Sequence, residues 1–169
     1  MGRCDRPGAV IDRAALSLAA WPLLGALLGA PSAFRVEPAA RAPLRELWAA
    51  SVAAKAERVA CLASVVQGDT LRITRIMPLS AGADSMAVSA RASLETCGPP
   101  AWQGTVHTHI AVQADGQPFD RFSGSDRGVM LMWWQRWRTD GTFCLLYAEA
   151  RVHCEIDGSG LVILPSGSY

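Results

Sequence analysis

Two closely spaced histidines are the residues of this sequence best suited to metal chemistry. His107 and His109 are separated by one residue, in the run Gly-Thr-Val-His-Thr-His-Ile, whose β-branched residues predict a strand. Side chains two residues apart on a strand lie on the same face, so the two imidazoles are expected side by side. Such a pair is half of a metal-binding site.

A serine and an aspartate follow at a spacing that predicts the start of a helix. Ser123 precedes a helix-compatible run from Gly124 to Arg138, and its hydroxyl can accept the first free backbone N–H groups as an N-cap. Asp126 then lies in the first turn. Two neutral imidazoles and one carboxylate are the ligand set of a catalytic zinc site, which keeps its fourth position open for water.

These motifs resemble the signature of the JAMM zinc metalloproteases (also called MPN-plus, Mov34/PAD-1 or JAB). That signature is a glutamate far upstream, then HxH, then SxxD. Here the glutamate is Glu57, which precedes the apolar run Val59–Leu62. The resemblance covers roughly Leu44 to the C-terminus, and it is to the bacterial type of the family.

The resemblance implies a role for each motif residue. Zinc would be bound by His107, His109 and Asp126, Glu57 would be the general base, and Ser123 would steady the tetrahedral intermediate. A metal-activated water would cleave an isopeptide or peptide bond after the C-terminal tail of a ubiquitin-like protein. The implied partner is that ubiquitin-like protein or its conjugate, and the reaction would be deconjugation or precursor maturation.

The implied fold is α/β. It is a single MPN-like (cytidine-deaminase-like) domain over residues 42–169, with a central, mixed, curved β-sheet flanked by helices. Residues 1–41 are expected to be an apolar N-terminal extension and a linker, the linker over Glu37–Arg41.

One segment departs from the family pattern. Ile110 stands where the family often has a proline, and the loop Ala111–Phe122 is longer than usual, with a turn expected at Asp115-Gly116. This loop discriminates between substrates: an open groove favours a protein tail, and a closed pocket favours a small substrate.

Two alternatives remain from other classes of function. One is a non-catalytic scaffold domain of the MPN kind, although such relatives typically lack a metal ligand that this chain keeps. The other is a zinc hydrolase acting on a small molecule or a cell-wall-type peptide.

A second histidine motif is weaker. His153-Cys-Glu155 matches the HxE half of a zinc deaminase signature, but the PCxxC half that supplies the thiolate ligands is absent. We therefore expect His153 to be an ordinary strand residue and Glu155 to be a surface charge.

Periodicity predicts the elements that position these residues. Pro43 is expected to open a helix over Leu44–Ala54, with Leu44, Leu47, Trp48 and Val52 toward the sheet. Residues 57–66 and 70–77 predict a hairpin about Gln67-Gly68-Asp69, with Glu57 at its beginning. The helix after Asp126 should pack its tryptophans on the sheet, and strands are expected over 142–148, 151–156 and 161–164.

The apolar segment Ala14–Phe34 has two interpretations. Proline and glycine interrupt it at Pro22, Gly25, Gly29 and Pro31, so a membrane-spanning helix is not favoured. We expect an arm that packs on the domain, on a second copy in a homodimer, or on a partner subunit. The alternative is an anchor or signal, which would make the protein membrane-associated or exported.

Composition narrows the partners and the compartment. The chain has 169 residues and a formal net charge of +1, with no basic stripe for a phosphate backbone, so nucleic acid is not expected as a partner. The five cysteines are odd in number and include no CxxC pair. They argue against a disulfide framework and favour a reducing cytosol, so a cytoplasmic location is expected.

Overall fold

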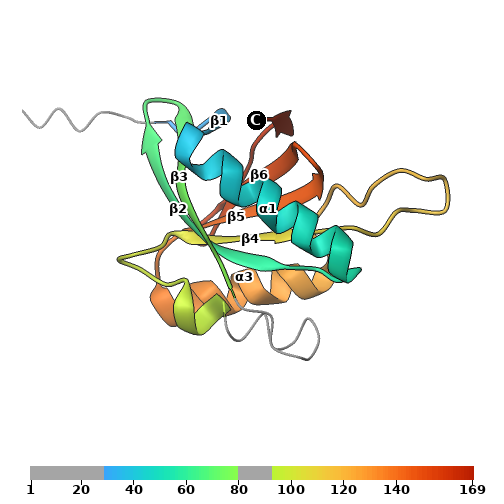
Figure 1. Ribbon diagram of the computed structural model, residues 1–169. Coiled ribbons are helices and arrows are strands. Elements are labelled where there is room, and N and C mark those ends of the chain that lie inside the picture. The colour runs from blue at the N-terminus through green and yellow to red at the C-terminus, as the bar shows by residue number, and fades with distance from the viewer. Residues whose placement is uncertain (1–28, 80–92) are drawn as a thin grey trace, which may run out of the picture.

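In the part of the chain that the structure describes, one mixed sheet of eight strands carries a long helix on each face. Figure 1 shows the computed structural model, which describes residues 29–79 and 93–169. The sheet order is β1-β3-β2-β4-β5-β6-β7, and β8 pairs with β6 beside β7. The strands are β1 (Ala33–Val36), β2 (Val59–Gln67), β3 (Thr70–Pro78), β4 (Gly104–Thr108), β5 (Gly141–Ala148), β6 (Arg151–Asp157), β7 (Leu161–Ile163) and β8 (Gly167–Ser168).

The sheet is mixed because two of its neighbouring pairs are parallel. β1 lies parallel to β3 and β4 parallel to β5, whereas the remaining pairs are antiparallel. The predicted hairpin of β2 and β3 is confirmed, with Gly68 at φ 63 in its turn. The three predicted C-terminal strands are confirmed as β5, β6 and β7. The α/β class and the mixed, curved sheet are as expected from the sequence.

Helix α1 (Pro38–Ala54) covers one face of the sheet. Its buried Leu44 and Leu47 join a core with even-numbered strand residues such as Leu62, Val106 and Leu146. Proline at the first helical position is favourable because its missing N–H would have no partner there. The helix ends at Lys55, in the left-handed region at φ 50.

Helix α3 (Gly124–Trp137) covers the opposite face. Its buried Met130 and Trp133 pack with odd-numbered strand residues, among them Cys61 and Phe143. The ligand histidines are also odd-numbered, so strand alternation directs them to the side of the sheet on which α3 lies.

The N-terminal part of the domain differs from expectation. The linker predicted over Glu37–Arg41 is wrong, because Glu37 occupies the N-cap position of α1 and the helix starts at Pro38, five residues before Pro43. The segment before it forms β1, which continues the sheet. Val52, expected to face the sheet, is 51% exposed. Residues 14–28 of the apolar segment lie outside the described residues.

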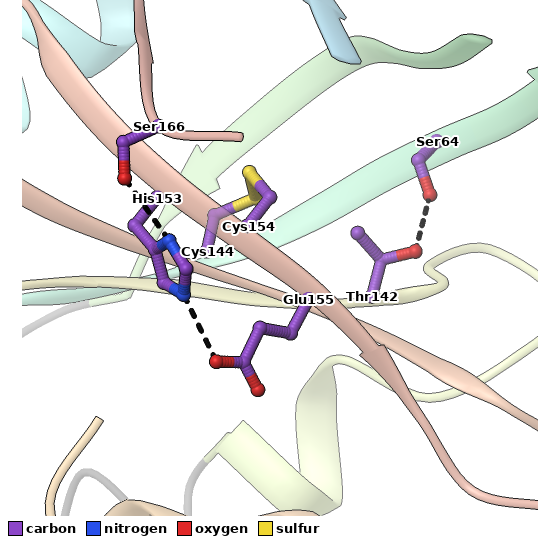
Figure 2. The surroundings of a disulfide bond; sticks show 7 residues. All are labelled: Ser64, Thr142, Cys144, His153, Cys154, Glu155 and Ser166. Carbon is purple, nitrogen blue, oxygen red and sulfur yellow. Dashed lines mark hydrogen bonds and ion pairs between the residues drawn. A yellow bond between two sulfur atoms is a disulfide. The ribbon is translucent and has the colours of Figure 1, made fainter. Parts of the chain in front are cut away.

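The expectation that the cysteines form no disulfides is wrong. Cys61 on β2 is bonded to Cys97, and Cys144 on β5 is bonded to Cys154 on β6. The second pair joins residues that stand directly opposite in the β5–β6 register (Figure 2). Both disulfides are buried, one on each face of the sheet. The cysteine pattern therefore no longer favours a reducing cytosol.

No helix within the two described ranges has both the length and the apolar character that crossing a membrane requires.

Candidate metal centre

Strand β4 positions the two histidines as the sequence predicts. His107 lies on β4 opposite Val59 of β2 and Leu145 of β5, and His109 follows the strand directly. The His109 backbone N–H donates to the Leu146 carbonyl at 2.9 Å, which extends the pairing with β5 by one residue. Both imidazoles therefore point to the same side, with their Nε2 atoms 3.3 Å apart.

Thr108, between the histidines, points to the opposite face and fixes the strand there. It is fully buried, and its hydroxyl lies 2.6 Å from the Ser51 hydroxyl at the end of α1. It also accepts the Arg58 backbone N–H at 2.8 Å. These bonds connect β4 to the segment that carries Glu57, a role for Thr108 that the sequence did not reveal.

The first turn of α3 supplies the aspartate, through a capping box. Ser123 is the N-cap, and its Oγ accepts the Asp126 backbone N–H at 3.3 Å. In return, Asp126 Oδ2 accepts both the Ser123 backbone N–H and the Ser123 hydroxyl, each at 2.7 Å. This reciprocal bonding satisfies otherwise free donors at the helix start and orients the carboxylate. The predicted N-cap and helix are confirmed.

The side chains of His107, His109 and Asp126 converge into what we call the ligand cluster. The structure identifies these three as a group able to hold a metal ion, with one donor atom of each lying within 4.8 Å of the others. Asp126 Oδ1 is 3.3 Å from His107 Nε2, and Asp126 Oδ2 is 3.6 Å from His109 Nε2. Two donors of a tetrahedral zinc ion at ordinary N and O ligand distances are separated by about 3.3 Å. The donor set therefore fits zinc in both chemistry and spacing.

A hydrogen bond outside the ligand cluster orients the His109 ring. Its Nδ1 is 3.1 Å from the Phe119 carbonyl oxygen, an acceptor that requires the proton on Nδ1 in the neutral ring. Nε2, which faces the cluster, then carries the free lone pair. A histidine ligand commonly donates its other N–H to a carbonyl in this way, which fixes both tautomer and ring orientation.

The cluster is electrostatically coupled. Burial alone would lower the pKa of His109, but the hydrogen bond to Asp126 and the charge of Glu57 outweigh it and raise that pKa. Burial alone would likewise raise the pKa of Asp126, but hydrogen bonds from His107 and His109 hold it well below its ordinary range. The carboxylate is thus ionised at neutral pH, as a metal ligand must be.

Glu57 lies beside the ligand cluster. It precedes β2, and its Oε1 is 3.9 Å from His109 Nε2. Its side chain is 28% exposed, so water can reach the carboxylate. The structure thus brings all five predicted site residues to one end of the sheet, with Ser123 bonded to Asp126.

A pocket opens between the sheet and α3 next to these residues. Its lining combines the site residues Glu57, His107 and Asp126 with the hydroxyl residues Ser93, Thr105 and Ser125 and with the apolar Val59, Phe122, Val129, Met130 and Phe143. A substrate held in this pocket would contact both the ligand cluster and an apolar wall.

The long loop after His109 forms a projecting arm, residues 110–122 (Figure 1). An antiparallel bridge joins Val112 to Pro118, and the predicted turn at Asp115-Gly116 is confirmed, with Gly116 at φ 80. Residues 111–117 are all exposed. The tip of the arm extends away from the body of the domain, whereas Phe119 at its base contacts His109.

The prediction that Glu155 is a surface charge is wrong. Its side chain is 3% exposed, and Arg127 of α3 donates to both of its carboxylate oxygens. Sequence reasoning missed this pair because its partners are far apart in the chain. The prediction that His153 is a strand residue is confirmed, because it lies on β6, where its Nε2 is 2.9 Å from Glu155 Oε1.

No protein-family model matches the chain, and a search of curated proteins finds no match. The likeness to the JAMM signature therefore rests on the motif residues themselves.

Proposed function

We propose that this protein is a zinc-dependent amide hydrolase of the JAMM type. In its most specific form, the proposal is an isopeptidase or peptidase that cleaves after the C-terminal tail of a ubiquitin-like protein. The observation that carries it is the convergence of three metal-ligand side chains with one further carboxylate, Glu57, within 3.9 Å of the nearest ligand nitrogen. A scaffold domain would have no need of this second carboxylate.

Bound zinc would supply Lewis acidity and would lower the pKa of a coordinated water. Glu57 is placed to accept a proton at Oε1 and to pass it to the departing amine, because it is partly exposed and lies beside the cluster without joining it. The Ser123 hydroxyl donates to Asp126 in the resting site, so stabilising an oxyanion would require it to turn toward the substrate.

The arm supports a protein substrate. Residues 111–117 are all exposed on an arm that extends from the body of the domain (Figure 1), so they are free to contact a large partner such as a protein chain. An extended tail is commonly bound as an added strand at a sheet edge, with backbone hydrogen bonds providing the affinity. The proposed partner is a ubiquitin-like protein or its conjugate.

The two disulfides favour a second candidate substrate. Disulfides persist in oxidising compartments and are rare in the reducing cytosol, where ubiquitin-like conjugation takes place. The same site acting outside the cytosol would hydrolyse an amide bond of a cell-wall-type peptide. The chemistry is identical in both proposals, and only the substrate differs.

Metal content and turnover, measured on matched variants, test the function. Wild-type protein should hold about one zinc per chain, since one ligand cluster fits one ion. His109→Ala and Asp126→Ala should lose it. Glu57→Gln should keep zinc and lose turnover by at least about 100-fold, the contribution typical of a general base. Glu46→Gln changes an exposed glutamate on α1 and serves as the control.

Two substrate panels separate the candidates. One panel contains ubiquitin-like proteins carrying a fluorogenic amide at the C-terminal tail, and the other contains branched cell-wall-type peptides. Full activity of Glu57→Gln would contradict the mechanism. A wild type that takes up no zinc and cleaves neither panel would favour the scaffold function instead.

A further inference from the structure

A buried carboxylate lies behind the ligand cluster, on the face of the sheet that α3 covers. Glu155 on β6 is 2% exposed as a residue, and an ionised group at such a site is unfavourable unless it is fully paired. Burial alone would raise the pKa of Glu155, but hydrogen bonds from Arg127 and His153 outweigh burial and lower it. Glu155 is therefore ionised, and it needs its partners Arg127 and His153 to stay ionised in a buried position.

One partner of Glu155, His153, lies on the same strand. His153 Nε2 lies 2.9 Å from Glu155 Oε1, and His153 Nδ1 lies 3.1 Å from the Ser166 hydroxyl (Figure 2). Because His153 and Glu155 are two apart on β6, they share a face, and the sheet holds both. The strand and His153 therefore hold the Glu155 carboxylate in place.

The partner from α3 is Arg127, the residue directly after the ligand Asp126. Its guanidinium donates to both Glu155 oxygens, with Nη2 to Oε1 at 2.9 Å. A two-point contact of this kind fixes direction as well as distance, because the guanidinium is planar. The first turn of α3 is thereby bound to β6.

A ring contact completes the attachment. Phe122, immediately before the N-cap, lies under the Arg127 guanidinium at 5.4 Å, and its ring contacts those of His107 at 5.6 Å and His153 at 5.8 Å. A residue just before the N-cap that packs on the fourth helical residue fixes the angle at which the chain enters the helix. Arg127 therefore contacts the Phe122 ring, which in turn touches a ligand histidine.

This arrangement matters because the ligands come from two elements. His107 and His109 are held by the β4 strand, whereas Asp126 is the one member of the ligand cluster on α3. Any shift of the first helical turn relative to the sheet would move Asp126 away from both imidazoles. Supporting contacts behind the ligands commonly set metal affinity for this reason.

We propose that the ion pair between Arg127 and the buried Glu155 is a positioning device for the metal ligand Asp126, which holds the first turn of α3 in the register that zinc binding requires. This inference rests on the proposed metal site. It assigns to Arg127 and Glu155 a role in metal affinity rather than in stability alone.

The decisive variant replaces both charges at once. Arg127→Met/Glu155→Met removes both charges of the ion pair, and such apolar replacements often preserve stability. The variant also takes away the hydrogen-bond partner of His153 Nε2. We expect its melting temperature to stay close to that of wild type, whereas its Kd for zinc rises about 10–100-fold. The affinity is measured on the full chain with zinc alone, by competition with a chromogenic chelator.

A second readout and a matched control separate positioning from stability. Co²⁺ in place of zinc reports ligand geometry through its visible spectrum, and we expect that spectrum to change in the double variant. Leu44→Ala lowers stability from the opposite face of the sheet and should leave both zinc affinity and cobalt spectrum unchanged. Wild-type zinc affinity in the folded double variant would overturn the proposal.

A milder variant covers the case in which the double variant does not fold. Arg127→Lys keeps the charge but loses the two-point contact, so zinc binding should weaken measurably. Unchanged affinity in Arg127→Lys would also overturn the positioning role. Absence of zinc binding in wild type would instead remove the metal site itself, and the inference with it, so the two failures are distinguishable.

Discussion

At the scale of single residues, two members of the ligand cluster are held by hydrogen bonds to groups outside it. His109 uses Nδ1 on Phe119 and keeps Nε2 for the cluster, and Asp126 is held by Ser123 on one oxygen while the other faces His107. His109 and Asp126 are thus each oriented by a contact that does not involve a metal. This preorganisation favours the binding of an ion.

Ser123 provides a first prediction, because its capping role can be separated from chemistry. Ser123→Ala should lower the free energy of unfolding of the zinc-free protein by about 1 kcal/mol, the usual cost of losing an N-cap. Ser123→Thr keeps a hydroxyl and should recover most of that loss. Urea unfolding followed by circular dichroism measures both variants, and equal stability of Ala and wild type would show that the cap is unimportant.

The lowered pKa of Glu155 predicts that the free energy of unfolding depends on pH. Its pKa is lowered in the folded protein from the ordinary value of 4.5, so its stabilising effect is complete above that value and is lost as pH falls through the folded value. Glu155→Gln resembles the protonated form, and near neutral pH it should be less stable by about 1–3 kcal/mol. The difference should shrink below pH 4.5 in unfolding curves of zinc-free protein, and a difference that persists unchanged in acid would contradict the pairing.

At the scale of elements, Cys144–Cys154 links two paired strands, whereas Cys61–Cys97 links β2 to a segment outside the sheet. The pairs also differ in the length of chain they enclose, with sequence separations of 36 for Cys61–Cys97 and 10 for Cys144–Cys154. A crosslink that closes a longer loop removes more conformational freedom from the unfolded chain. The two disulfides should therefore contribute unequally.

A matched pair of double variants tests this difference. Loop closure predicts a loss of about 4 kcal/mol for Cys61→Ala/Cys97→Ala and about 3 kcal/mol for Cys144→Ala/Cys154→Ala. Denaturant unfolding of oxidised protein gives both values. As a control, unfolded wild type should show one free thiol, five cysteines less the four that are paired. Five thiols, or no effect of reductant on stability, would contradict the disulfides.

The sequence predicted the strand of the histidines and the cap at Ser123 because those depend on neighbours in the chain. The HxH and SxxD motifs each span only a few consecutive residues, so alternation and capping were enough to predict their local structure. Whether Cys144 and Cys154 stand opposite each other depends on the register between β5 and β6. A two-residue turn at Glu149-Ala150 in a regular hairpin would put Cys144 opposite Glu155, but a bulge between Leu146 and Ala148 shifts the pairing by one.

The same reasoning explains the error at Glu155. A one-residue shift exchanges the two faces of a strand, and the partner of Glu155 on α3 lies 28 residues away. Cys61 and Cys97 are likewise brought together only by the tertiary fold. The start of α1 was misplaced for a local reason, because two prolines, Pro38 and Pro43, are both able to occupy a first turn.

At the scale of the whole molecule, the site forms at one end of the sheet. β4 and β5 are parallel neighbours, and the connection that follows the carboxyl end of β4 contains His109, the arm and the start of α3. β2 runs antiparallel to β4, so the start of β2 brings Glu57 to the same end. Sites in sheets of this kind commonly lie beyond the carboxyl ends of parallel strands, where connections are free to vary.

Because the ligands come from both a strand and a helix, zinc should stabilise the whole fold. Zinc at 100 times its Kd should add about 2.7 kcal/mol to the free energy of unfolding. For a chain of this size, that corresponds to a rise of about 5–10 °C in melting temperature. Calorimetry with zinc and then with a chelator measures the shift, and Asp126→Ala should show none. A wild type with no shift would contradict a formed site.

The arm is closed at both ends near its base, by the bond from His109 to Phe119 and by the capping box at Ser123. A change at its tip, Asp115-Gly116, should therefore not move the ligands. The free energy of closing a loop also grows only slowly with loop length, so a longer tip costs little stability. A change in the length of this tip would alter the surface that the arm presents to a partner and would leave the ligand cluster unchanged. For the same reason, an affinity tag or a fluorescent reporter inserted between these two residues should leave zinc binding intact.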